Sequence, residues 1–154
     1  MFIAAHAASG ALIAHQVDNY WLVFFLAFIS HFVLDIIPHG DYHHVHDYFN
    51  GGKKLVKNLY NVILVDSIVS VMLATLLLTY TSTDRTLIAI GIIGAILPDL
   101  LVGIHESWTQ AGLRWFNKMH FKVHNSLAKN FPVRPIIGAI GQAFFIIAML
   151  AIIY

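Results

Sequence analysis

Long apolar segments separated by short polar ones limit this chain to few folds. Each segment approaches or exceeds the roughly 20 residues that an α-helix needs to cross the apolar part of a bilayer. Hydrophobic residues make up 58% of the 154 residues and charged residues 11%, a composition that excludes a soluble globule. The sequence therefore predicts an all-α, polytopic membrane helix bundle in one domain over residues 1–154. Its five spans are expected at Phe2 to Val17, Tyr20 to Ile37, Leu55 to Tyr80, Leu87 to Ile104 and Ile136 to Tyr154.

The basic residues predict how these helices are oriented. All but one of the 9 fall in two polar segments, Lys53, Lys54 and Lys57 in the first, and Arg114, Lys118, Lys122, Lys129 and Arg134 in the second. Because loops rich in Lys and Arg stay in the cytoplasm, we expect both segments, and with them the N-terminus, on the cytoplasmic side. The net charge is only +1, and no basic stripe alternates with aromatic residues, so nucleic acid is not expected as a partner.

The segment near 106–130 differs from the five apolar ones, because its apolar residues recur at helical spacing on one face. Cations at steps of four, Arg114, Lys118 and Lys122, occupy another face. Such a pattern is typical of an amphipathic helix that lies on lipid headgroups. We therefore predict an interfacial helix on the cytoplasmic side, with membrane lipid as its partner.

Histidine is unusually abundant, with 10 residues, whereas cysteine is absent, so any metal has to be held by imidazole and carboxylate groups. His31, Asp35 and His39 follow one another at steps of four, on one face of a helix that Pro38 is expected to end. The predicted topology brings further His and Asp residues to the same cytoplasmic level. The candidate metal ligands are His6, His31, Asp35, His39, Asp41, Asp99, His120 and His124.

This set exceeds what one zinc ion requires, so it leaves room for two or more divalent metals, with zinc as first choice and manganese or iron as alternatives. Purely structural roles for some of these residues remain open. His120 and His124 would also suit an interfacial helix at headgroup level, and Asp99 would also suit the end of a helix. Asp66, near the predicted midplane, would either bond to Ser70 or serve as an outer-shell or proton-relay group. The tract His43, His44 and His46 has no assigned role.

Several of these motifs resemble a known family. The segment from Ser30 to Asp41, the turn Gly94 to Asp99, the N-terminal His6 and the late pair His120 and His124 are similar to small bacterial inner-membrane proteins described as metal-dependent hydrolases. That family in turn resembles, more remotely, zinc-dependent phospholipase C. The resemblance implies a multi-pass protein of the inner (cytoplasmic) membrane, a helical His/Asp metal site and hydrolytic chemistry, without naming a substrate.

The leading hypothesis is a membrane-embedded, metal-dependent hydrolase in which a metal-activated water attacks a phosphoester or lipid headgroup bond at the cytoplasmic face. The substrate would be a phospholipid or another phosphorylated compound. Asp41 or Asp99, where not a ligand, would be the catalytic general base. Three alternatives stay open: a divalent-metal transporter or sensor without hydrolytic activity, a haem protein with paired histidines, and an assembly partner whose polar motif only locks helices together. The oligomeric state stays unassigned.

Overall fold

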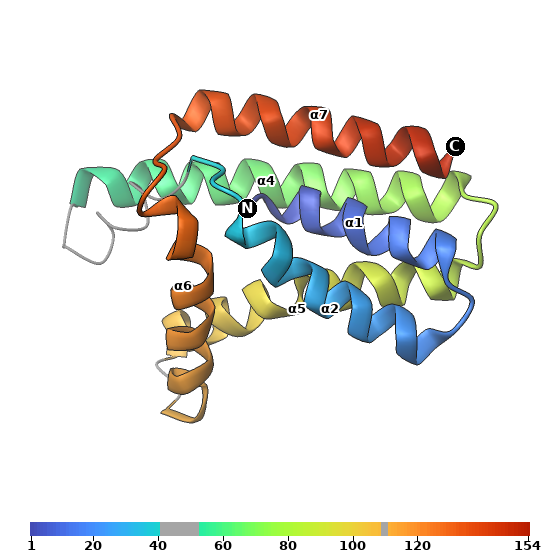
Figure 1. The fold of residues 1–154 in the computed structure, drawn as a ribbon, viewed down its shortest axis with the longest axis horizontal. Coiled ribbons are helices and arrows are strands. Elements are labelled where there is room, and N and C mark those ends of the chain that lie inside the picture. Colours follow the sequence, from blue (N-terminus) through green and yellow to red (C-terminus); the bar gives the residue numbers. More distant parts are fainter. Residues whose placement is uncertain (41–52, 109–110) are drawn as a thin grey trace.

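The structure is a computed structural model that describes residues 1–40, 53–108 and 111–154, and these residues form helices and no strands. The predicted all-helical bundle is confirmed (Figure 1). Its elements are α1 (Ile3–Gln16), α2 (Tyr20–Ile36), α4 (Lys53–Tyr80), α5 (Arg85–Trp108), the short 3₁₀ helix η1 (Ala111–Leu113), α6 (Arg114–Ala128) and α7 (Pro135–Ile153).

Within the part of the chain that the structure describes, three helices are long and apolar enough to cross a membrane, rather than the predicted five. They are Asn61–Tyr80 within α4, the whole of α5 and the whole of α7. The first predicted span is shorter because its ends, Phe2 and Val17, are extended, which leaves 14 helical residues in α1. At 1.5 Å per residue α1 reaches only about 21 Å. The 17-residue α2 ends at Ile36, because the residue before Pro38 is driven into an extended conformation.

The short helix α1 lies at the centre of the bundle and contacts α2, α4, α5 and α7. Its buried face consists largely of alanine, with Gly10 pressed against Gly91 of α5. Small residues allow two helix backbones to approach closely, as is common in membrane helix bundles. The sequence of α1 therefore suits an inner position, while the large apolar side chains of α2, α4 and α7 remain exposed on the outside of the bundle.

The N-terminal turn of α1 has no capping side chain of its own. Its backbone N–H groups are satisfied from other helices: Ile3 and Ala4 donate to the Asp66 carboxylate of α4, with N···O distances of 2.7 and 3.2 Å. The Phe2 N–H donates to Gln142 Oε1 of α7 at 2.6 Å. Backbone N–H groups at a helix start cost free energy when they are buried without acceptors. Asp66 and Gln142 therefore stabilise the N-terminal end of α1.

The predicted interfacial helix near 106–130 is shorter than expected. Residues Glu106 to Trp108 continue α5, and α6 begins only at Arg114. His105, which precedes Glu106 in α5, is buried. Gly112, a poor helix former, lies in η1 between the two helices. The predicted amphipathic character is present, because α6 buries Phe116, Asn117, His120, His124 and Ala128 while Arg114, Lys118 and Lys122 are exposed.

The described segments that carry the candidate His and Asp ligands meet at one end of the bundle. The start of α1, the end of α2, the end of α5 and the start of α7 lie at this end, and α6 runs across it (Figure 1). The turn from α1 to α2, the turn from α4 to α5 and the C-terminus lie at the opposite end. The up-and-down path of the helices therefore gathers the His and Asp residues that are far apart in the sequence.

At the opposite end of the bundle, Asp84 caps the N-terminus of α5. Its carboxylate accepts hydrogen bonds from the backbone N–H of Thr86 and from the Tyr20 hydroxyl, at 2.7 and 3.0 Å. The first of these bonds in particular holds the pKa of Asp84 below its ordinary value. A lowered carboxyl pKa contributes stability above the unfolded value of about 3.9, and this contribution is lost as the pH falls through the folded value.

We therefore expect Asp84→Ala to lower the melting temperature at pH 7 by a few degrees. The gap to the wild type should narrow when the pH falls below about 4, where the wild-type carboxylate also becomes protonated. Circular dichroism melts of both proteins in detergent between pH 3 and 8 would measure this. Equal melting temperatures at pH 7 would mean that the cap has no effect on stability.

Candidate metal centre

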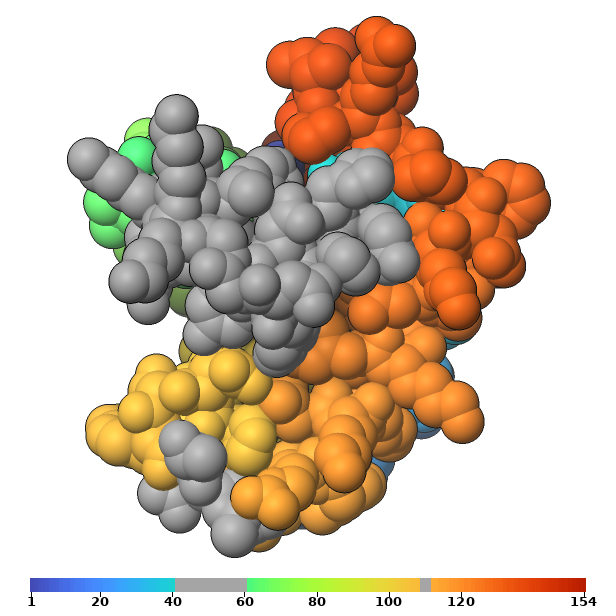
Figure 2. All heavy atoms as spheres, turned by 90° about the vertical axis from the view of Figure 1, so that its left-hand side faces the viewer, coloured from blue at the N-terminus to red at the C-terminus, as the bar shows by residue number. Residues whose placement is uncertain are grey.

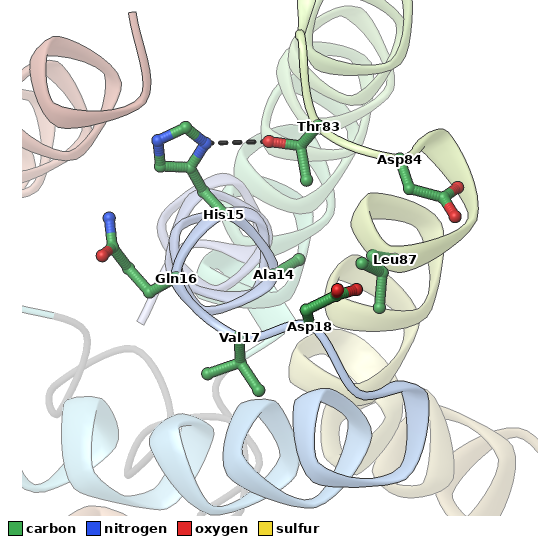
Figure 3. Close-up of a pocket in the computed structure, with 8 residues that line it drawn as sticks. All are labelled: Ala14, His15, Gln16, Val17, Asp18, Thr83, Asp84 and Leu87. Carbon is green, nitrogen blue, oxygen red and sulfur yellow. Dashed lines mark hydrogen bonds between the residues drawn. The ribbon is translucent and has the colours of Figure 1, made fainter.

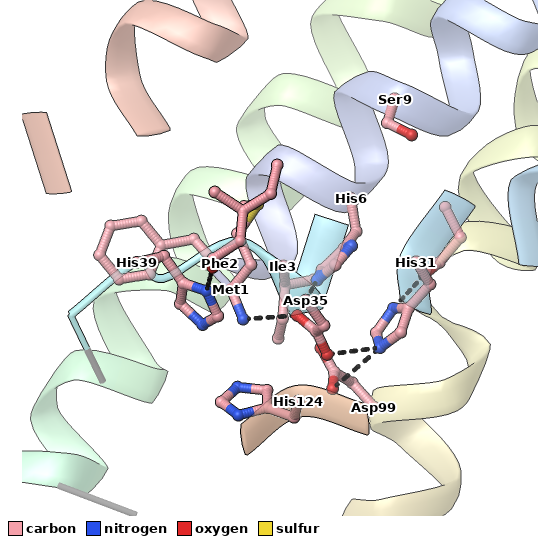
Figure 4. Close-up of polar contacts among 12 residues, drawn as sticks. Met1, Phe2, Ile3, His6, Ser9, His31, Asp35, His39, Asp99 and His124 are labelled. Atoms are coloured by element: carbon pink, nitrogen blue, oxygen red, sulfur yellow. Dashed lines mark hydrogen bonds and ion pairs between the residues drawn. The ribbon is translucent and has the colours of Figure 1, made fainter. Parts of the chain in front are cut away.

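Five segments supply the His and Asp side chains at the end of the bundle that α6 crosses. His6 comes from α1, His31 and Asp35 from α2, His39 from the turn after α2, Asp99 from α5, and His120 and His124 from α6. Figure 2 shows this end from the outside, with α6 and the chain after it along one side and the end of α5 beside them. Figure 4 shows how the side chains converge on Asp35.

Four of these residues, His31, Asp35, Asp99 and His120, form a group that could hold a metal ion. Each offers one ligand atom, and all four atoms lie within 4.8 Å of one another. His31 Nε2 lies 3.2 Å from Asp35 Oδ2 and 3.6 Å from Asp99 Oδ1. His120 Nε2 lies 3.5 and 3.7 Å from the same two oxygens. Two imidazoles and two carboxylates are a donor set that suits zinc, and also manganese or iron.

The hydrogen bonding of His31 fixes which of its ring nitrogens faces the two carboxylates. Its Nδ1 lies 2.7 Å from the carbonyl oxygen of Ala95, which can only accept, so Nδ1 carries the proton. In a neutral ring Nε2 then holds a lone pair, and it faces two carboxylates. Both His31 Nε2 and Asp35 Oδ2 are buried, and with a neutral ring neither has a hydrogen-bond partner among the residues that the structure describes. Such an arrangement is repulsive unless a cation lies between these atoms or the ring takes a second proton.

Asp35 is held so that only one of its oxygens faces this group. Oδ1 accepts hydrogen bonds from His6 Nε2 at 3.2 Å and from the Met1 amino group at 2.8 Å (Figure 4). Oδ2 is left facing His31 and His120. Groups that orient a ligand in this way are usual around metal sites. His6, which the sequence predicted as a ligand, lies outside both candidate groups and donates to Asp35, its ring stacked on that of His31 at 3.9 Å.

A second candidate group consists of Asp35, His39 and His124, so Asp35 belongs to both. The His39 Nδ1–H donates to the carbonyl oxygen of Ile37 at 2.6 Å, which places the lone pair of the neutral ring on Nε2. The rings of His39 and His124 meet edge to face with their centres 4.9 Å apart. Two groups joined by one carboxylate would allow two ions to lie close together.

Burial keeps His120 in the protonation state that binds metal. It lowers the pKa of His120 to about 4, although the carboxylates of Asp99 and Asp35 act in the opposite direction. The ring is therefore neutral at pH 7, and a neutral imidazole is the form that coordinates a metal ion. Asp99 is the most accessible member of its group, with 27% of its side chain exposed, whereas the other three side chains are almost fully buried.

The remaining candidates from the sequence are Asp41, Asp66 and the histidine tract. Asp41 and the tract His43, His44 and His46 lie outside the described residues. Asp66 caps α1 through its carboxylate, whereas the Ser70 hydroxyl, one turn on, donates to the backbone carbonyl of Asp66 at 2.7 Å and lies 3.5 Å from the carboxylate. Sequence reasoning missed Gln142, although a lone polar residue in an otherwise apolar helix is itself a signal.

A shallow pocket of about 200 Å³ lies at the opposite end of the bundle (Figure 3). It is lined by the turns next to His15, Asp18 and Asp84, and none of the residues in the two candidate metal groups borders it. His15 Nδ1 lies within hydrogen-bond distance, 2.8 Å, of Thr83 Oγ1. His15 therefore lies at the far end of α1, away from the candidate metal centre.

Comparison of the chain with protein families, with curated proteins and with solved structures found no match. The resemblance to membrane-bound metal-dependent hydrolases therefore rests on the sequence motifs alone.

Proposed function

We propose that this protein is a membrane-embedded, metal-dependent hydrolase that cleaves a phosphoester or lipid headgroup bond at the cytoplasmic face. The observation that carries the proposal is the contact of the buried His31 Nε2 with the Asp35 and Asp99 carboxylates, a set of donor atoms that a metal cation would stabilise. The geometry and burial of the four donors fit a divalent ion.

The four residues of the group around His31 would have different roles in such a site. His31, Asp35 and His120 would hold the ion from the buried side, while the partly exposed Asp99 borders the accessible side. A bound divalent ion would lower the pKa of water and neutralise charge on a phosphate, so no Ser or Cys nucleophile is needed. Asp99 is then the candidate to accept a proton from the attacking water or to complete the ligand set.

The outer face of α6 supports a lipid-level substrate. Arg114, Lys118, Lys122 and Lys129 are exposed, on the side of α6 away from the buried His120 and His124. Trp108 and Trp115 nearby are 71% and 67% exposed, as aromatic residues at a headgroup boundary often are. Exposed cations of this kind attract anionic headgroups, which would raise the local concentration of a phosphorylated substrate beside the metal centre.

We expect the full chain, purified in detergent without a His tag, to hydrolyse a phosphodiester or phospholipid only when loaded with metal. Removal of the metal by a chelator should lower the rate at least 100-fold, on the order expected for lost Lewis-acid and water activation, and added zinc or manganese should restore it. Asp84→Asn, at the far end of the bundle, is the control that should respond like the wild type. Fully metal-loaded protein that hydrolyses none of these substrates would refute the proposal and favour a transporter or sensor.

A further inference from the structure

The N-terminal half of α7 is seated on the turn that carries His39. Gly138 lies so close to this turn that a Cβ atom there would collide with the carbonyl oxygen of His39. Gly40, with φ of 94°, faces the start of α7, where a Cβ atom would come within 2.8 Å of Pro135 Cα. The turn and the helix therefore fit together at backbone distance, without side chains between them.

Gln142, one turn further along α7, ties the same turn in place by hydrogen bonds. Its side chain is almost completely buried, with 4% of the residue exposed. Nε2 donates to the carbonyl oxygen of His39 at 3.3 Å and to that of Gly138 at 3.2 Å. Oε1 accepts from the backbone N–H of Phe2 at 2.6 Å. Gln142 thus joins the turn after α2, the start of α1 and α7.

His39 depends on such external support more than the other candidate ligands do. His31 and Asp35 project from α2, Asp99 from α5 and His120 from α6, all of them regular helices. His39 follows the end of α2, after the extended Ile37. Its ring is tied to that same backbone, because Nδ1 donates to Ile37. The position of the ring relative to Asp35 and His124 therefore follows from where α7 holds the turn.

We propose that Gly138 and Gln142 are positioning residues that set the metal affinity of the group Asp35, His39 and His124, and leave the group around His31 unaffected. The inference rests on the proposed metal centre. Neither residue is a metal ligand: Gly138 acts through the backbone of His39, and Gln142 acts through the same backbone while also holding the Phe2 N–H. Outer-shell changes of this kind typically cost about 10- to 100-fold in metal affinity.

The test is a titration of metal-free, full-length protein in detergent with Co²⁺, followed by visible absorption and calorimetry. We expect two Co²⁺ ions per wild-type chain. Gly138→Ala and the isosteric Gln142→Met should weaken one of them at least tenfold, while the affinity for the other changes less than about twofold. His39→Ala should weaken the same ion. Binding of the unaffected ion also shows that each variant is folded.

Gly141→Ala is the matched control, because it makes the same substitution one helical turn along α7, at a position where a Cβ atom would meet nothing within 4 Å. It should bind two ions with wild-type affinities. Equal weakening of both ions in the Gly138 and Gln142 variants, unchanged binding of both, or a single ion in the wild type would each overturn the inference. A wild-type chain that binds no Co²⁺ would instead refute the proposed metal-dependent function itself.

Discussion

Asp35→Asn should leave the purified protein without stoichiometric metal. Asp35 is the carboxylate that both candidate groups share, and it is 1% exposed. Asparagine keeps the volume but removes the negative charge that would offset a buried cation between His31 and His120. Because changes in the outer shell alone cost about 10- to 100-fold in metal affinity, loss of this ligand should cost more than about 100-fold. Elemental analysis of protein purified in detergent without a His tag measures the metal content directly.

Two further proteins sharpen that experiment. The double variant His31→Ala, Asp35→Ala removes both α2 donors of the first group and should also be metal-free. Asp84→Asn replaces a carboxylate with an amide in the same way, at the end of the bundle opposite the candidate centre, and should keep its metal. If Asp35→Asn retains as much metal as Asp84→Asn, the two groups are not metal sites. The His and Asp residues would then serve to hold the helices together.

Gly10→Ala should destabilise the bundle markedly, although it adds only one methyl group. A Cβ atom at Gly10 would collide with the backbone carbonyl of Gly91, and backbone cannot move aside as a flexible side chain can. The central helix α1 would have to shift relative to α5, its most extensive neighbour. Overpacking in a well-packed core typically costs about 1–3 kcal/mol. The loss should be measured as a lower midpoint in denaturant or thermal unfolding in detergent.

Gly103→Ala is the matched control for this prediction. Gly103 lies in α5, as Gly91 does, but a Cβ atom there would meet nothing within 4 Å. Alanine favours a helix over glycine by about 1 kcal/mol, so Gly103→Ala should be neutral or slightly stabilising. Similar midpoints for Gly10→Ala and Gly103→Ala would show that the contact of α1 with α5 is more accommodating than its geometry implies.

The helices could be predicted from the sequence because long apolar runs between polar segments are typical of membrane helices. The sequence predicted too many spans because apolar composition does not show where a helix ends: Phe2 and Val17 are apolar but extended. His39 follows Asp35 by four residues, which is the spacing of one helical turn. The two residues are not on one helix, however, because α2 ends at Ile36, ahead of Pro38. His39 nevertheless approaches Asp35 from the turn, as part of the second candidate group rather than the first.

The outer contacts of the candidate centre could not be predicted from spacing. Gln142 bonds to Phe2 and His39, 140 and 103 residues away, and Asp66 bonds to Ile3 across 63 residues. Their partners are backbone groups, which every residue possesses and which leave no pattern in a sequence. Similarly, nothing in the spacing distinguished His6 from a ligand. Its role as a donor to Asp35 depends on the stacking of α1 beside α2.

The capping of α1 by Asp66 has a consequence for the order in which the protein assembles during synthesis. The N–H groups of Ile3 and Ala4 find their acceptor on α4, and that acceptor leaves the ribosome 63 residues after Ile3 does. A buried backbone N–H group without a partner costs free energy comparable to a lost hydrogen bond. The N-terminal turn of α1 is therefore expected to reach its final position only after α4 has been translated. Assembly of this end of the bundle would then be a collective event rather than the addition of one helix after another.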